Sequence, residues 1–430
     1  MRNAAREIFQ YALEQCNIAS AFARDVSYER GVLRIREDLF ALDRYLHVFA
    51  VSVGKAAHAM AEALVQQVGT RVYGVVVSSV EPANRLSNFT YFQGGHPLPN
   101  EDSLRGARQI LSSLAKLGDH DLVIFMISGG GSSMLEKPLD EGVSLSELVE
   151  TYRVLVHSGA PIAEINAIRK HLSAVKGGRL AAAAALAQQV SILVSDVPEN
   201  ALDSLASGPT MPDSSTVEDC YAIAAKHGLR DEFPTPVKGI FRQRALAETP
   251  KSDDVVFVRS RWWPILSSGT AAEAAARKAV SLGFAVEIDS RCDDWDYMRA
   301  ADYLLQRVRE TRSRRGRACV ISAGEVTVRV SGESGRGGRN QQFALYCATR
   351  IEGENMVVLS AGTDGIDGNS EAAGAVVDGT TVTRVREAGL DPKKGLAGFD
   401  AFPIFQQLGD AIVTGPTGTN VRDVRVLLAW

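Results

Sequence analysis

Two stretches in the first half of this 430-residue chain place glycines and polar groups directly after apolar runs. Gly54 and Lys55 follow the run 45–51 and precede a predicted helix, and the backbone N–H groups at such a junction favour an anion. A lysine there adds a point charge. The second stretch, after the run 122–127, consists of Ser128, Gly129, Gly130, Gly131, Ser132 and Ser133. For Gly54 and Lys55, the alternative to an anion site is a packing glycine with a solvated lysine. For residues 128–133, the alternative is a sharp strand-to-helix turn.

The second half of the chain contributes carboxylates and a guanidinium group. Asp364 and Asp367 have glycine neighbours and lie just past the apolar run 356–361, so they follow a predicted buried strand. Such carboxylates hold Mg²⁺ or accept a hydroxyl proton during phosphoryl transfer, although Asp-Gly pairs also form ordinary turns. Arg339 and Asn340 lie among glycines and amides, a composition suited to bidentate capture of phosphoryl oxygens.

Further polar groups occupy a predicted helix and two strand ends. Asn166 and Arg169 are three residues apart and share one helix face, where they form either an anion site or a solvated basic surface. Asp196 follows the apolar run 190–194, and Glu325 follows a second predicted strand. Because the carboxyl ends of parallel strands meet at one edge of a sheet, we expect the loops of the first half to converge there.

The order of predicted elements indicates two domains. Buried strands alternate with helices along the first half, which predicts a doubly wound, Rossmann-like α/β domain. An irregular stretch punctuated by Pro234, Pro236 and Pro250 marks the boundary. A second alternation of strands and helices follows and predicts a C-terminal α/β domain. The predicted limits are 1–243 and 250–430.

Composition argues against several classes of protein. A net charge of −4 gives no bulk attraction to nucleic acid or to an anionic membrane. The five cysteines are scattered and form no CxxC pair, which argues against a disulfide framework and a zinc site. The first residues lack an apolar segment typical of a secretion signal, and no apolar run has membrane-spanning length. We therefore expect a cytoplasmic protein that binds neither nucleic acid nor a membrane.

Eight motifs along the chain resemble those of one family. They are VGKAAHAM, GGHPLPNEDS, SGGGSSML, INAIRKHLSAVKGGRLA, VSDV with SGPTMPD, GGRNQQFAL, GTDGIDGNSEAAGA and TGPTGTNVRD. In this order, and over nearly the whole chain, the set is similar to the glycerate 2-kinase family, whose C-terminal half is the MOFRL domain. The joint occurrence of eight motifs is far more specific than any one of them.

The resemblance implies an activity and a set of site residues. It implies phosphorylation of D-glycerate at its 2-hydroxyl, with ATP and Mg²⁺, giving 2-phosphoglycerate and ADP in a cleft between the two domains. The central residues of the family map onto Lys55, Arg339 and Asp364, and the candidate metal ligands are Asp364 and Asp367. The residues expected at substrate or phosphate are Ser128, Gly129, Gly130, Gly131, Ser132, Ser133, Asn166, Arg169, Asp196, Glu325 and Asn340. We expect a monomer or a homodimer.

Two positions depart from the family pattern, and two other functions stay open. Ala323 interrupts the usual SGGE and Glu199 replaces the usual glycine of VSDVPG, which puts loop shape and substrate preference in question. One alternative is an NAD(P)H-dependent hydroxypyruvate reductase, and the other is a non-catalytic protein that binds a sugar acid or a nucleotide. No GxGxxG follows a strand with an acidic partner, so a nicotinamide site has no support. The stretch 128–133 also lacks the GK[ST] ending of a P-loop.

Overall fold

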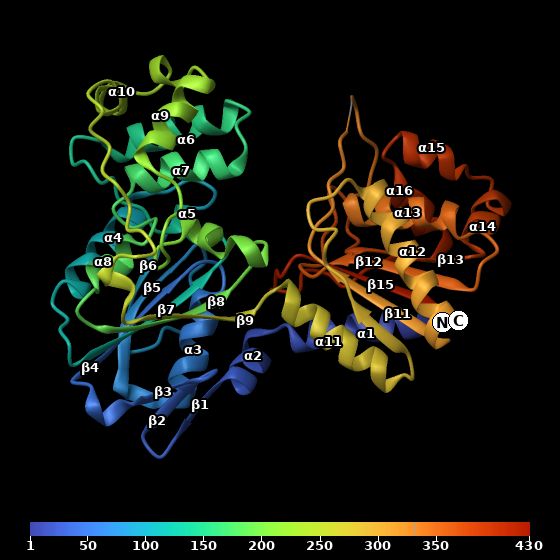
Figure 1. Cartoon of the computed structure of the whole chain (residues 1–430), viewed down its shortest axis with the longest axis horizontal. Helices are drawn as coiled ribbons and strands as arrows, with labels where there is room; N and C mark the ends of the chain where they lie inside the picture. Colours follow the sequence, from blue (N-terminus) through green and yellow to red (C-terminus); the bar gives the residue numbers. More distant parts are fainter. Residues whose placement is uncertain (331) are drawn as a thin grey trace. The chain divides into compact units, whose positions relative to one another are not determined.

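The computed structural model describes residues 1–330 and 332–430, and the chain divides into two compact units. Unit 1 combines Met1–Ala21 with Leu266–Trp430, and unit 2 is Phe22–Ile265. Figure 1 shows both units, coloured along the chain. The two ends of the chain therefore belong to the same unit.

The units differ from the predicted limits of 1–243 and 250–430 at both ends of unit 2. The first helix, α1 (Arg2–Gln15), lies in unit 1 because Arg2 forms ion pairs with Asp378 and Asp410. The segment after the prolines stays in unit 2 because β9 (Ser260–Leu266) joins its sheet. Long-range pairing, which local composition does not report, determines both differences.

The main sheet of unit 2 is parallel through five of its strands. Its strands are β4 (His47–Val53), β5 (Val72–Ser78), β6 (Phe89–Gln93), β7 (Asp121–Ser128), β8 (Gln188–Val194) and β9 (Ser260–Leu266), in the order β6-β5-β4-β7-β8-β9. The chain moves outward from β4 to β6 and then returns to the other side of β4 with β7. The topological switch point, where ligands bind in doubly wound sheets, therefore lies between β4 and β7.

Helices cover both faces of this sheet. Apart from α2 (Ile18–Asp25), which crosses the boundary between the units, the helices of this part of the chain are α3 (Ala57–Val68), α4 (Glu101–Leu114), α5 (Gly131–Met134), α6 (Leu145–His157), α7 (Ile162–Leu172), α8 (Arg179–Ala183), α9 (Val217–Lys226) and α10 (Thr235–Arg242). Side chains of α4 and α8 pack with Val51, Val75 and Phe125, whereas α3 contacts β4 and β5 outside that cluster and so covers the opposite face. In Figure 1, α6, α7, α9 and α10 gather at one end of the unit, around a core of their own.

Short elements complete unit 2. A small antiparallel sheet contains β1 (Val26–Glu29), β2 (Val32–Ile35) and β3 (Asp38–Ala41). The 3₁₀ turns are η1 (Leu42–Arg44), η2 (Gly69–Arg71), η3 (Glu199–Ser207), η4 (Leu229–Asp231) and η5 (Val255–Phe257). The predicted doubly wound α/β domain is confirmed by the parallel sheet and its helices.

Unit 1 is built on a mixed sheet. Its strands are β10 (Ala285–Ile288), β11 (Ala318–Ala323), β12 (Met356–Gly362), β13 (Gly374–Asp378), β14 (Ala411–Ile412) and β15 (Asp423–Ala429), in the order β10-β11-β15-β12-β13-β14. The β10–β11 pair is parallel, and β15 runs antiparallel to both β11 and β12. The start of β15 therefore lies beside the ends of β11 and β12, at one edge of the sheet.

Two layers of helices enclose this sheet. One layer, on one face of the sheet, contains α1 (Arg2–Gln15) and α11 (Ser268–Ser281). The layer on the opposite side contains α12 (Tyr297–Arg315), α13 (Arg339–Arg350), α14 (Thr381–Glu387), α15 (Pro392–Ala397) and α16 (Ala401–Leu408) (Figure 1). Alternate residues of β11, β12 and β15 pack with α12, α13 and α16. The predicted C-terminal α/β domain is confirmed.

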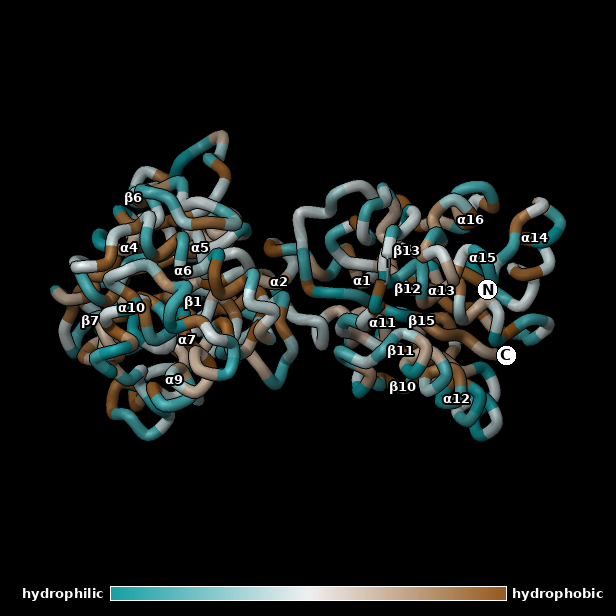
Figure 2. The backbone as a smooth tube through the Cα atoms, turned by 90° about the horizontal axis from the view of Figure 1, so that it is seen from above, coloured by the Kyte–Doolittle hydropathy of each residue, from teal (hydrophilic) through white to brown (hydrophobic). Residues whose placement is uncertain are grey.

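Apolar residues of the central strands form the two cores. All eight residues of β7 and all seven of β15 are buried, as expected for strands covered on both faces. In Figure 2 the tube is brown, and hence apolar, along much of β15. The five cysteines are buried, and none of them is in a disulfide bond. Within the described residues, no helix has the length and apolar character needed to span a bilayer.

Candidate active site

The loop after β4 requires glycine. Gly54 has a φ of 117°, a conformation that side chains disfavour, and a Cβ on it would lie 2.4 Å from the carbonyl oxygen of Ser128. Its N–H donates to the carbonyl of Val77 at 3.1 Å. Three adjacent strands are therefore joined through Gly54, and the residue after it is placed at the switch point of the sheet.

Lys55 lies over the loop that follows β7. Its backbone N–H donates to the carbonyl of Gly129 at 3.0 Å, and its side chain passes close to Gly130, whose Cβ would lie 3.3 Å from Lys55 Cγ. The side chain is exposed, and among the ion pairs of the described residues none involves Lys55. The ammonium group is thus available to a ligand.

His96 lies beside this lysine. Its Nδ1 is 3.1 Å from Ser133 Oγ, and burial together with the charge of Lys55 lowers its pKa. A neutral imidazole can accept a hydrogen bond as well as donate one. We call Gly54, Lys55, His96 and the loop Ser128–Ser133 the lysine cluster. His96 belongs to the GGHPLPNEDS motif, and the signal that could have placed it at this site is its position just after β6.

The glycines of the loop after β7 serve close packing. A Cβ on Gly129 would lie 2.1 Å from Asp196 Oδ2, so the carboxyl of Asp196 lies directly against the loop. Gly130 has a φ of 81°. The hydroxyl of Ser128 is already engaged, since it accepts from the Ala56 N–H at 3.0 Å and donates to the Val53 carbonyl at 3.3 Å. The structure brings Lys55, Ser128–Ser133 and Asp196 together, as expected, and their contact with a ligand stays a prediction.

Arg169 lies against a buried charged group that the sequence did not reveal. Its guanidinium lies over the ring of Tyr152 at 4.6 Å, and its Nε is buried without a hydrogen-bond partner. The Tyr152 hydroxyl donates to Glu136, which also accepts from Ser173 and Lys176. Burial lowers the pKa of Lys176, although Glu136 opposes this effect. Asn166 is half-buried on the same helix.

In unit 1, Arg339 is held by two carboxylates. As the first residue of α13 it donates through Nε and Nη2 to the two oxygens of Asp423, at 2.6 and 3.1 Å, and it pairs with Glu325 at 2.7 Å. Burial alone would lower the pKa of Arg339, but Asp423 raises it. Burial and the charge of Asp423 raise the pKa of Glu325. The guanidinium is therefore permanently charged and fixed in orientation.

Asp364 lies at the same edge of the sheet. A Cβ on Gly362 would lie 3.0 Å from Asp364 Oδ1 and 3.4 Å from Asp423 Oδ1, so both carboxyl groups approach one point. Asp364 is half-buried, and its Oδ1 accepts from the Ile366 N–H at 3.1 Å. The residues Glu325, Arg339, Asp364, Arg422 and Asp423 form what we call the arginine cluster.

Asp367 anchors the start of α13. Its two oxygens accept from the backbone N–H groups of Asn340 and Gln341, at 3.0 and 2.9 Å, and from both side-chain amides, at 3.3 and 3.0 Å. Burial raises its pKa to about 6. The Asn340 amide oxygen accepts from Ser360. With four donors already on its carboxyl group, Asp367 fits a helix anchor better than a metal ligand. Residues 1–330 and 332–430 contain no group of three or more His, Cys, Asp or Glu that could hold a metal ion.

Sequence reasoning missed two members of the arginine cluster. Asp423, which is 1% exposed, orients Arg339, and the buried Arg422, with a φ of 70°, pairs with Asp293 and, at 3.4 Å, with Asp294. Both lie in the TGPTGTNVRD stretch, and the available signal was an acid at the first position of an apolar strand. Their partners are more than 80 residues away along the chain, so spacing could not identify them.

Two family models match the chain. The Domain of unknown function (DUF4147) matches residues 4–242 and the MOFRL family matches residues 318–423. The chain is 39% identical to D-glycerate 2-kinase of Thermotoga maritima, over 89% of this chain and 90% of the relative. It is 36% identical to a protein of Agrobacterium vitis provisionally named hydroxypyruvate reductase, over 88% of this chain and 86% of the relative. The crystal structure of a glycerate kinase of T. maritima superposes with a TM-score of 0.85 at 35% identity, covering 100% of this chain and 99% of that one.

Proposed function

We propose that this chain, which belongs to the glycerate 2-kinase family, transfers a phosphoryl group from ATP to the 2-hydroxyl of D-glycerate and releases 2-phosphoglycerate and ADP. The observation that carries the proposal is the meeting of Arg339, Asp364 and Asp423 at one edge of the sheet of unit 1. A fixed guanidinium beside a carboxylate provides charge stabilisation and a proton acceptor, the two functions that phosphoryl transfer to an alcohol requires.

Three residues have proposed catalytic roles. Asp364 accepts the proton of the glycerate hydroxyl, while Lys55 and Arg339 stabilise the charge that develops on the transferring phosphoryl group. His96, whose pKa is lowered by burial and by the charge of Lys55, can hydrogen-bond to the substrate. Substrate or phosphate contacts are further proposed for residues 128–133, Asn166, Arg169, Asp196, Glu325 and Asn340.

The proposal assigns one carboxylate, that of Asp364, as a ligand of Mg²⁺. Mg²⁺ is commonly held by one or two carboxylates together with nucleotide phosphates, and when bound it neutralises charge on the phosphate oxygens. Asp364 fits that role, because it is half-buried and only one hydrogen bond to its carboxyl group is seen among the described residues. Asp367 does not fit it, because four donors occupy its oxygens.

An ADP-release assay with the full chain tests the proposal. D-glycerate, hydroxypyruvate and four-carbon sugar acids are offered with ATP and Mg²⁺, and the product with glycerate is identified by NMR as the 2-phosphate or the 3-phosphate. ADP release with D-glycerate and formation of the 2-phosphate support the proposal. Oxidation of NADH with hydroxypyruvate and no ADP release would support the reductase activity, which one relative's name suggests. If the chain shows neither the kinase nor the reductase activity, the result supports a non-catalytic binding protein.

A matched pair of variants links the activity to the arginine cluster. Asp364→Asn keeps the shape of the side chain and removes its charge, so we expect kcat to fall by about 10²–10⁴. Asp391→Asn, at the start of α15, changes another acid of the same unit and should leave kcat unchanged. Equal turnover by both variants would contradict the role of Asp364. The cytoplasmic location and the oligomeric state stay predictions, the first in keeping with five cysteines that form no disulfide.

A further inference from the structure

A pocket of about 250 Å³ opens beside Arg339 in unit 1. Its lining combines glycine backbone with apolar and polar side chains, and Arg339 is the only charged residue among the described residues that line it. The lining residues are Val328, Val330, Ser334, Gly335, Gly337, Gly338, Arg339, Gln342, Gly368, Asn369, Phe399 and Ala401. The volume is small for a whole ligand and suits one uncharged moiety of a larger molecule.

The apolar wall of this pocket includes the side chains of Phe399 and Val330. Phe399 is half-buried and is not among the described residues that form the core of unit 1, and its φ of 50° is a costly conformation for a bulky side chain. Val330 is also outside the core and is 48% exposed. An aromatic ring held in a strained backbone at the wall of a pocket indicates a contact with a ligand.

The glycine wall of the pocket is preformed. Asn369 fixes it, because its side chain donates to the Gly335 carbonyl at 3.1 Å and accepts from the Gly337 N–H at 2.8 Å. A Cβ on Gly338 would lie 2.3 Å from Asp367 Oδ1, and one on Gly368 would lie 2.2 Å from the Gly337 carbonyl oxygen. These glycines leave bare backbone, against which a flat molecule can lie closely.

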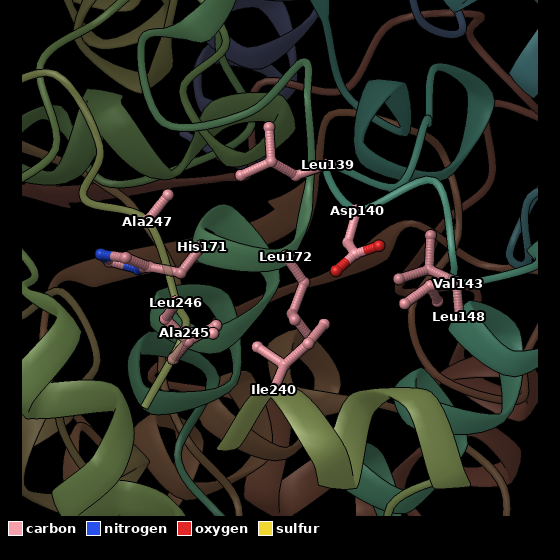
Figure 3. Close-up of a pocket in the computed structure, with 10 residues that line it drawn as sticks. All are labelled: Leu139, Asp140, Val143, Leu148, His171, Leu172, Ile240, Ala245, Leu246 and Ala247. Atoms are coloured by element: carbon pink, nitrogen blue, oxygen red, sulfur yellow. The ribbon is translucent and has the colours of Figure 1, made fainter. Parts of the chain in front are cut away.

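A second pocket of about 240 Å³ lies in unit 2 and fits an anionic ligand less well. Figure 3 shows its apolar lining with Asp140 on one side and His171 on the other. Both ring nitrogens of His171 are already engaged, with the Ala167 carbonyl at 2.8 Å and with Glu248 at 2.9 Å. Among the described residues that line this pocket, Asp140 is the one carboxylate, and it would repel phosphates.

We propose that the pocket beside Arg339 binds the base and ribose of the nucleotide, with the phosphates directed toward Arg339. This inference rests on the proposed function, because ATP is the phosphoryl donor of that reaction. The uncharged base lies between Phe399 and the apolar residues Val328 and Val330, and the charged end meets the guanidinium. D-glycerate, a small anion with hydroxyl groups, has no part that matches an apolar wall. The pocket therefore assigns the nucleotide, and not the sugar acid, to this part of unit 1.

Binding of ADP to the full chain, measured by isothermal titration calorimetry, tests this assignment. Phe399→Gly removes the ring and relieves the positive φ, so the fold should stay at least as stable while the Kd for ADP rises by about 10-fold or more. Val330→Asp places a carboxylate in the wall and should weaken ADP similarly. The matched controls are Arg30→Gly, which relieves a φ of 50° in unit 2, and Val280→Asp, at a 60% exposed valine of α11. Both controls should bind ADP like the wild type.

The outcomes separate this inference from the proposed function. Weaker ADP binding by the two pocket variants, with the KM for glycerate unchanged, supports the pocket as the nucleotide site. Wild-type ADP affinity in both pocket variants, or no ADP binding by the wild type, overturns it. If the wild type phosphorylates glycerate and the pocket variants match it, the inference fails and the proposed function stands. If the pocket variants lose ADP binding but the wild type has no kinase activity, the site stands and the function fails.

Discussion

The two clusters differ in how far their charges are neutralised by the protein itself. In the arginine cluster, Arg339 donates to both oxygens of Asp423 and pairs with Glu325, while Arg422 pairs with Asp293. In the lysine cluster, the Lys55 side chain is exposed, and the described residues show no ion pair to it. The protein therefore fixes the direction of one cation and leaves the other free to follow its ligand. A forked guanidinium contributes geometry as well as charge, whereas an ammonium contributes a mobile point charge.

Of the two cations, we expect the larger effect at Arg339. Arg339→Lys keeps the positive charge but cannot bind both oxygens of Asp423 and a phosphoryl oxygen together. We expect kcat with glycerate to fall by about 10²–10³. Steady-state kinetics of the purified variant measure the loss. Near wild-type turnover would show that charge alone matters here and would remove the contrast with Lys55.

The free cation should behave in the opposite way. Lys55→Met removes the charge and should lower kcat/KM by about 10²-fold, whereas Lys55→Arg should recover at least a tenth of the activity, because no fixed partner depends on the ammonium geometry. The same assay compares the two variants. An arginine variant as inactive as the methionine variant would mean that Lys55 is held as strictly as Arg339.

Removing the partner of the fixed cation tests how the fixation works. Asp423→Asn deletes the charge that orients Arg339, and a lost charge-assisted hydrogen bond of this kind should lower kcat by about 10- to 100-fold. Asp378→Asn, which removes one of the two carboxylate partners of Arg2 in the same unit, is the matched control and should leave kcat unchanged.

A pH profile distinguishes positioning by Asp423 from a purely structural role. Besides burial, the charge of Asp423 raises the pKa of Glu325, so Asp423→Asn should lower that pKa. A limb of the kcat profile governed by Glu325 would then move to lower pH. A variant that loses thermal stability but keeps the wild-type kcat and profile would contradict the positioning role.

The smallest effect concerns stability and pH. The pKa of Asp367 is about 6 in the folded chain, whereas an unfolded aspartate has a pKa near its ordinary value of about 4. Between these values the folded chain binds more protons, so the free energy of unfolding falls as pH rises from about 4 to about 6, by about 2 kcal/mol from this group. Asp378, whose pKa Arg2 helps to lower to about 2 against the effect of burial, contributes the opposite slope at lower pH.

Urea unfolding at several pH values measures this contribution. Asp367→Asn should lose the decline between pH 4 and 6 relative to the wild type, although its own stability will be lower because an amide cannot accept four N–H groups. Parallel slopes for the two proteins across that range would contradict the assigned pKa.

Much of the fold could be predicted because its signals are local. The run 122–127 lies within β7, and the glycine stretch after it forms the loop at the switch point of the sheet. Gly54 and Gly365 lie in loops after β4 and β12, where φ values of 117° and 89° require them. The family resemblance is confirmed by relatives that span most of the chain. An unbroken apolar run or a glycine after a strand is a property of neighbouring residues, so the sequence reports it directly.

The roles within the site depended on pairing over long distances. Asp364 and Asp367 look alike in the sequence, yet Asp364 stays half-buried beside Asp423 while Asp367 is buried under the first turn of α13. The partner of Arg339 lies 84 residues further along the chain. Helix α1, first in the chain, packs in the unit that contains the last strand.

The sequence by itself determined which loops are polar and glycine-rich, which strands are buried and which family the chain belongs to, since these follow from local composition and from motifs in order. Only the tertiary structure decided which carboxylate anchors a helix, which orients the arginine, and which cation stays free. Those assignments depend on burial and on hydrogen bonds between strands and loops that the chain brings together, and no residue's neighbours in the sequence specify them.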